Sequence, residues 1–95
     1  MAIFCATYEY DPSAIATLDE VRPAHRDWLA EQPQLLLSGP TDANGAVLVW
    51  EGESAAEVEA ILDGDPFHPA GVIAQRRVVA WQPVRGSWLE KLSLP

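Results

Sequence analysis

The sequence predicts an α+β domain with the ferredoxin-like order β-α-β-β-α-β. Three observations support this fold class. Strand-like and helix-like runs follow one another in that order along the chain. An Asn-Gly pair between the two middle strand-like runs is typical of an antiparallel hairpin. The chain has 95 residues, which is enough for one hydrophobic core but not for two. We therefore expect a four-stranded antiparallel sheet with both helices on one face.

The first strand and the first helical region are expected near the N-terminus. Residues 2–10 are rich in aromatic and β-favouring side chains, and the turn-forming pair Asp11-Pro12 follows them. Apolar residues then recur at spacings of three and four, which is the period of a helix. Pro23 interrupts this pattern, because proline disfavours the helical conformation in the residue before it. We expect a short helical segment from about Ser13 and a second helix that begins at Pro23.

Three further strand-like runs complete the expected sheet. Residues 35–40 and 46–53 are joined by a turn in which Asn44 and Gly45 supply the positive φ values of a hairpin. The apolar run VIAQRRVVAW, residues 72–81, predicts the last strand.

The helix between the third and fourth strands is expected to begin at Ser54. Ser54 and Glu57 have the spacing of a capping box. In such a box the serine hydroxyl accepts a hydrogen bond from the glutamate N–H, and the glutamate side chain bonds back to the serine N–H.

Composition and charge limit the classes of partner. One domain is expected over residues 1–84, with a C-terminal tail over residues 85–95. Six Lys and Arg residues against fourteen Asp and Glu residues give a formal net charge of −8, so no nucleic-acid partner is expected. No apolar run approaches the ~20 residues that cross a bilayer, and no charged leader precedes the first strand, so we expect a cytoplasmic protein with no membrane partner. The only cysteine, Cys5, excludes an intrachain disulfide.

The predicted sheet is apolar on both faces. In the first strand Phe4 and Ala6 alternate with Ile3 and Cys5, and the third strand has the same double pattern. Helices can cover only one of these faces. We therefore expect the other face to pack against a second copy of the chain in a homodimer.

His25 lies on the apolar row of the first helical region, four residues after Val21 and three before Trp28. It is either a buried imidazole with a structural hydrogen bond or a reactive group in a cleft, and the reactive interpretation needs a partner. Asp65, held before Pro66 just beyond the second predicted helix, can supply a carboxylate. An aspartate before proline is also typical of a simple turn, so both interpretations stay open.

His68 and Ser38 are further candidates. His68 is either a surface loop residue or a donor that lines a pocket. Ser38 either bonds local backbone at the end of its strand or faces the same pocket as His25. The two histidines lack the short spacing of metal ligands, so no metal is expected. Glycine-rich phosphate-binding motifs are absent from the sequence, so no nucleotide cofactor is expected.

Four motifs, taken together and in order, resemble the YciI-like family of YCII-related proteins. They are R-P-A-H at residues 22–25, S-G-P at 38–40, D-P-F at 65–67 and W-x-P at 81–83. The resemblance spans roughly residues 3–84. It implies a ferredoxin-like fold of the dimeric α/β-barrel group, which agrees with the fold that the sequence pattern predicts.

The resemblance also implies roles for individual residues. The histidine and aspartate that this family is thought to use as an active-site pair fall on His25 and Asp65. Further substrate contacts are expected from residues in or next to the motifs, namely Ser38, Arg22, Phe67 and His68.

Three functions follow as hypotheses. The resemblance implies a cofactor-free lyase or isomerase that transfers a proton on a small cyclic or aromatic molecule, with His25 as general base and Asp65 as the group that orients it. The alternative is a non-catalytic small-molecule-binding or accessory dimeric module, in which the pair is a structural hydrogen bond. Cofactor-free monooxygenase chemistry on a quinol, which the same fold group supports, is a third. Fold alone does not choose among them, so the surroundings of the pair decide.

Overall fold

A computed structural model describes residues 2–91 of the chain, and its elements follow the predicted order. The strands are β1 (Ala2–Tyr10), β2 (Leu35–Thr41), β3 (Gly45–Gly52) and β4 (Ile73–Trp81). The helices are α1 (Ile15–Ala30), α2 (Ala55–Leu62) and α3 (Trp88–Lys91), with a short 3-10 helix over Pro12–Ala14 before α1. Within the expected C-terminal tail, residues 92–95 lie outside the described residues.

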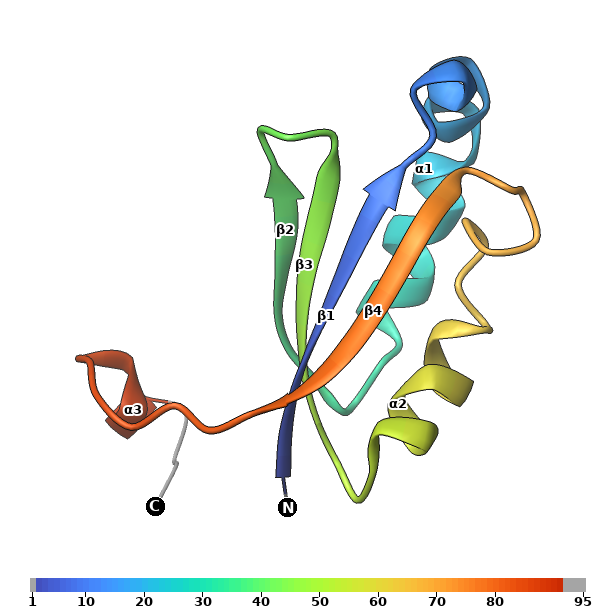
Figure 1. Cartoon of the computed structure of the whole chain (residues 1–95). Helices are drawn as coiled ribbons and strands as arrows, with labels where there is room; N and C mark the ends of the chain where they lie inside the picture. Colours follow the sequence, from blue (N-terminus) through green and yellow to red (C-terminus); the bar gives the residue numbers. More distant parts are fainter. Residues whose placement is uncertain (1, 92–95) are drawn as a thin grey trace.

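The strands form one antiparallel sheet in the order β2-β3-β1-β4. Helices α1 and α2 lie on one side of this sheet, and α3 lies on the other side (Figure 1). The ferredoxin-like fold predicted from the sequence is therefore confirmed. None of the described helices is long and apolar enough to cross a membrane.

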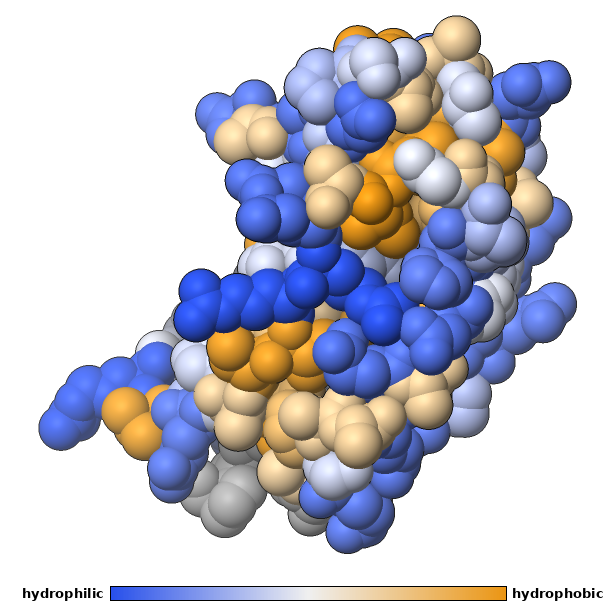
Figure 2. All heavy atoms as spheres, turned by 45° about the vertical axis from the view of Figure 1, so that its right-hand side comes forward, coloured by the Kyte–Doolittle hydropathy of each residue, from blue (hydrophilic) through white to orange (hydrophobic). Residues whose placement is uncertain are grey.

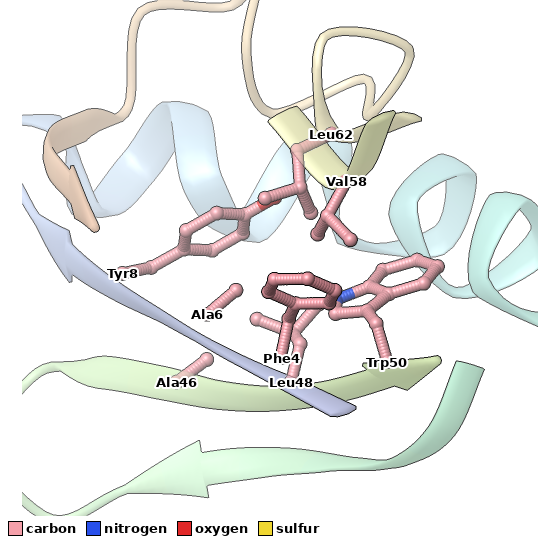
Figure 3. Packing of buried hydrophobic residues seen from close by; sticks show 8 residues of the cluster. All are labelled: Phe4, Ala6, Tyr8, Ala46, Leu48, Trp50, Val58 and Leu62. Carbon is pink, nitrogen blue, oxygen red and sulfur yellow. The ribbon is translucent and has the colours of Figure 1, made fainter. Parts of the chain in front are cut away.

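The main core lies between the sheet and the two larger helices. Alternation along β1 turns Phe4 and Tyr8 toward the helices, and the strand register sets Phe4 opposite Trp50 of β3. Val58 and Leu62 of α2 pack onto these side chains (Figure 3). The phenol of Tyr8 thus lies inside the core, where a polar group needs a hydrogen-bond partner.

Helix α1 differs from the sequence expectation at Pro23. The sequence predicts a helix that begins there, whereas α1 runs through Pro23 without a break. Pro23 and Asp19 are both exposed, so water can reach the Asp19 carbonyl that proline leaves without a helical N–H donor. Leu18 and His25, on either side of Pro23, are buried and hold both halves of the helix against the core. Tertiary packing therefore outweighs the local preference of proline.

The turn between β2 and β3 also differs from the expectation. Asn44 has a positive φ of 56°, whereas Gly45 is already the first residue of β3 and pairs with Thr41. The connection is a longer loop that ends in one left-handed residue, instead of a two-residue turn that needs two. Gly45 is required for another reason, because a Cβ atom there would collide with the carbonyl oxygen of Tyr8.

The capping box of α2 is half formed. Ser54 Oγ accepts a hydrogen bond from the Glu57 N–H at 3.1 Å. The Glu57 carboxylate, however, accepts a hydrogen bond from the side-chain amide of Gln34, which lies just before β2. A tertiary contact therefore replaces the predicted bond back to Ser54.

The sheet face away from α1 and α2, which we call the open sheet face, is apolar. Together with Trp88 of α3, it lines a groove of about 500 Å³. The strand residues that line this groove include Cys5, Leu37, Val47, Val49, Val79 and Trp81. On the side that carries the helices, by contrast, a band of strongly hydrophilic side chains lies between apolar patches (Figure 2).

Candidate active site

His25 and Asp65 form a buried pair. His25 lies on α1 and Asp65 in the loop after α2, and His25 Nδ1 is 2.8 Å from Asp65 Oδ1. His25 is 8% exposed and Asp65 is completely buried. The loop is held by backbone bonds on both sides of the aspartate: its N–H donates to the Leu62 carbonyl at 3.0 Å, and its carbonyl accepts from the His68 N–H at 2.8 Å. The Asp65 side chain therefore points into the protein and not into water.

Three donors from three segments surround the Asp65 carboxyl group. Besides His25, the Phe67 N–H donates to Oδ1 at 3.0 Å, and the Tyr8 hydroxyl of β1 donates to Oδ2 at 2.8 Å. A carboxylate is an acceptor only, and every one of these neighbours can donate. The arrangement compensates for the burial of a charged group and fixes the direction of both carboxylate oxygens.

Tyr8 is held in its protonated form. Burial raises the pKa of its phenol far above the ordinary value of about 10, and the negative charge of Asp65 raises this pKa further. The phenol therefore remains a hydrogen-bond donor to Asp65 over the whole ordinary pH range.

The ring of His25 is fixed in its plane and in its tautomer. It stacks on the ring of Phe67, with centroids 4.0 Å apart and planes 10° from parallel. Because Asp65 only accepts, Nδ1 carries the proton of their shared hydrogen bond. Nε2 is then the nitrogen that remains to accept a proton from a ligand.

A cavity of about 240 Å³ lies beside the pair, between α1 and the β2 side of the sheet. Its wall includes His25 itself and the stacked ring of Phe67. Leu29 of α1 and Leu48 of β3 add apolar surface, and Ser38 contributes from the edge strand β2. A ligand in this cavity would therefore meet apolar side chains, one imidazole and the polar side chains of Arg22, Arg26 and Ser38.

The structure brings most of the predicted site residues together. His25, Arg22, Ser38 and Phe67 line the cavity, and Asp65 lies behind His25. His68 does not belong to this group, because its half-exposed imidazole faces the Asp63 carboxylate on the surface, 3.8 Å from it. Among residues 2–91 no three His, Cys, Asp or Glu side chains lie close enough to share a metal ion.

Sequence reasoning missed two side chains of the site. Tyr8 continues the alternation of Phe4 and Ala6 on the face of β1 that points toward the helices, and this pattern indicates that Tyr8 is buried. The sequence around Tyr8 gives no sign that Asp65 is its hydrogen-bond partner. Arg26, one turn beyond Arg22 on α1, also lines the cavity. The spacing of four residues between the two arginines was the available signal.

The sequence matches the family model of the YCII-related domain over residues 1–82. The chain belongs to the YCII-related domain family. The family indicated by the four sequence motifs is thereby confirmed. No curated protein matches the sequence of this YCII-related protein.

Solved structures similar to this YCII-related protein share its fold. One is 5-chloro-2-hydroxyhydroquinone dehydrochlorinase (TftG) from Burkholderia phenoliruptrix AC1100 in complex with 2,5-dihydroxybenzoquinone. It is 26% identical with a TM-score of 0.76, and the match covers 84% of this chain and 93% of that one. A nipsnap family protein of unknown function from Agrobacterium tumefaciens is 22% identical with a TM-score of 0.60, over 92% of this chain and 91% of its own. An antibiotic biosynthesis monooxygenase is 17% identical with a TM-score of 0.56, over 90% and 100%.

Proposed function

We propose that this YCII-related protein is a cofactor-free lyase or isomerase that acts on a small cyclic or aromatic molecule. The observation that carries the proposal is the buried His25–Asp65 pair at the wall of a small cavity. Since Nδ1 is bonded to Asp65, Nε2 is the atom that takes a proton from a substrate in the cavity.

The pair suits proton transfer in both directions. When Nε2 accepts a proton, the resulting imidazolium is stabilised by the Asp65 carboxylate, 2.8 Å from Nδ1. In an isomerase the proton then returns to another atom of the same molecule. In a lyase a leaving group departs as a double bond forms, and the imidazolium later releases the proton to water.

The similarity to the dehydrochlorinase supports the lyase interpretation and a single-ring substrate. That protein is named for a chlorinated single-ring compound and was solved with a single-ring quinone. The cavity of about 240 Å³ is smaller than the roughly 300–1,000 Å³ typical of sites for drug-sized ligands, so it suits a molecule of that size.

Two assays test this proposal. The first measures chloride release from 5-chloro-2-hydroxyhydroquinone, and the second uses NMR to measure deuterium exchange into the ring in D₂O. His25→Gln should lower either rate by at least about 100-fold, because it removes the general base. His68→Gln is the matched control, since His68 is the other histidine of the chain and lies outside the cavity. Equal rates for the two variants would contradict the proposal.

A non-catalytic binding module is the second candidate, and the complete burial of Asp65 favours it. In that case the aspartate links Tyr8, His25 and Phe67 for structural reasons alone. If the protein is a binding module, Asp65→Asn lowers thermal stability, and neither the wild type nor the variant shows turnover. If the pair is catalytic, the folded Asp65→Asn variant loses the turnover that the wild type shows. Asp63→Asn is the exposed control two residues away.

We also propose that the protein is a homodimer that associates through the open sheet face. Apolar side chains gather there in one groove, and Val79 and Trp81 are 40% and 47% exposed in the single chain. An isologous pairing would cover both copies of this face at once. Trp88 of α3 lines the same groove, so the C-terminal segment would take part in the contact.

A further inference from the structure

The cavity beside His25 has a charge opposite to that of the protein as a whole. The chain carries fourteen acidic and six basic residues. Two of the six basic side chains, Arg22 and Arg26, nevertheless line this cavity, and no aspartate or glutamate does. Two carboxylates lie close to the lining residues: Asp65 is behind His25 and accepts hydrogen bonds from three donors within the protein, and Asp19 is paired with Arg22 on the exposed side of α1.

The two arginines flank the reactive imidazole. Arg22 and Arg26 are four residues apart on α1, so they lie on neighbouring turns of one helix face, and His25 directly precedes Arg26. Arg22 forms an ion pair with the exposed carboxylate of Asp19, 3.0 Å from its Nη1, which leaves other N–H groups of its guanidinium for a ligand. Arg26 makes no ion pair with any carboxylate of the described chain.

The other walls of the cavity are suited to an apolar ring. Leu29, Leu48 and Phe67 supply apolar lining, and Ser38 and Tyr10 are the lining residues that carry a hydroxyl group. A fully hydrated inorganic anion gains nothing from such walls. An anion attached to a ring can place its charge at the guanidinium groups and its ring on the apolar surface.

We infer that the cavity binds small single-ring organic anions, carboxylates or phenolates, with the charged oxygen atoms at Arg22 and Arg26 and the ring toward Nε2 of His25. The inference names the substrate class of the proposed reaction and therefore rests on the proposed function. It also gives the arginines a part in the chemistry, because they stabilise the negative charge left on the ring when His25 removes a proton.

Binding of simple probes tests the inference without any reaction. Benzoate is titrated into the wild-type protein while ¹H–¹⁵N NMR spectra report on His25 and Phe67, with benzyl alcohol as the neutral probe of the same shape and inorganic phosphate as the anion without a ring. We expect benzoate to shift the signals of both residues and to bind at least tenfold more tightly than either of the other probes. Equal affinity for benzoate and benzyl alcohol, or tighter binding of phosphate, would overturn the inference.

Two arginine variants make the test specific. Arg26→Gln should weaken benzoate binding at least fivefold, and it should fold normally because Arg26 is exposed. Arg77→Gln is the matched control, since Arg77 is an exposed arginine of β4 that does not line the cavity. If Arg77→Gln weakens binding as much as Arg26→Gln does, the effect is one of net charge and the inference is wrong.

The outcomes for ligand class and for reaction are separable. If benzoate binding depends on Arg26 while His25→Gln leaves turnover unchanged, the substrate class stands and the proposed reaction fails. If turnover depends on His25 while neutral rings bind as well as benzoate does, the reaction stands and the anion inference fails.

Discussion

At the scale of single residues, Asp65 connects the candidate active site to the hydrophobic core. Its carboxylate accepts hydrogen bonds from β1, from α1 and from its own loop. A buried acceptor that loses one donor keeps its full desolvation cost, so each of the three bonds contributes to the stability of the fold as well as to the position of His25.

Tyr8→Phe should therefore lower the free energy of unfolding by about 1–3 kcal/mol, because it leaves Asp65 Oδ2 buried without its donor. Urea denaturation at pH 7 measures this difference. Tyr10→Phe is the control, since Tyr10 is only half-buried and its hydroxyl does not bond Asp65. Equal stability of the wild type and Tyr8→Phe would mean that the Tyr8–Asp65 bond contributes nothing.

Tyr8 also predicts how stability depends on alkaline pH. Its folded-state pKa is raised above the unfolded value of about 10, so below pH 10 both states keep the proton and pH has no effect through Tyr8. Above pH 10 the unfolded chain loses this proton while the folded protein keeps it, and the free energy of unfolding falls as pH rises. The fall should be shallower in Tyr8→Phe than in the wild type, by about 0.7 kcal/mol per pH unit at pH 10 and approaching about 1.4 kcal/mol per pH unit above it. Denaturant titrations between pH 9 and 11 measure both slopes, and parallel slopes would contradict the assignment of a protonated Tyr8.

Part of this site could be predicted from the sequence. The helical period placed His25 on the buried row, and the motif resemblance named Asp65 as its partner. Tyr8 is 57 residues from Asp65 along the chain, and their contact depends on where α2 ends over β1. Local sequence patterns carry no information on such a distance, so they could not identify the phenol as the second partner.

At the scale of elements, tertiary contacts decided three local features. Pro23 lies inside α1, Asn44 alone supplies the left-handed residue of the hairpin, and Glu57 bonds Gln34 instead of Ser54. In each case the sequence signal for an element was correct, and its local detail changed because a neighbouring segment offered a better contact. Element order and type, and the start of α2 at Ser54, were therefore predictable, whereas the start of α1 and the geometry of the β2–β3 turn were not.

Pro23→Ala should stabilise the protein. Alanine restores the N–H that can donate to the Asp19 carbonyl, and proline in a helix interior is about 3 kcal/mol less favourable than alanine, so we expect a gain of about 1–3 kcal/mol in the free energy of unfolding. Thermal and urea denaturation measure it. Pro33→Ala, outside the helix, should give no such gain. A loss of stability in Pro23→Ala would show that the proline is favourable where it stands.

At the scale of the whole molecule, the apolar open sheet face is the surface through which we propose that the chain dimerises. The order of strands and helices predicted this face, because a sheet with both faces apolar has only one covered by helices. The sequence could not predict that Trp88 of α3 would line the same groove, since the path of the chain after β4 has no periodic signal.

Val79→Lys should convert the protein from a dimer to a monomer, because it places a charge at the apolar groove. Light scattering at micromolar concentration should change from twice 10.4 kDa to 10.4 kDa. Ile15→Lys is the control, since Ile15 is an exposed apolar residue of α1, away from the groove. A wild-type protein that is already monomeric under these conditions would refute the dimer.

Cys5 gives a second measurement of the same association. Burial raises the pKa of its thiol, so little thiolate is present at neutral pH, and the residue lines the groove of the open sheet face. Its reaction with a thiol reagent should be slow in the dimer and faster in Val79→Lys. Equal reaction rates would indicate that the groove is open in both proteins.

The two sides of the cavity are built in different ways, and this has a consequence for how new specificities arise. His25 and Asp65 are tied into the core, so a substitution that moves them also threatens folding. The opposite wall, at Ser38, belongs to β2, which is an edge strand with β3 as its only neighbour in the sheet and which has mostly exposed side chains. Mutations there can change the shape and polarity of the cavity at little cost in stability. If the proposed reaction holds, diversification within such a lineage would therefore proceed through β2, while the proposed acid–base pair stays unchanged and serves differently shaped rings.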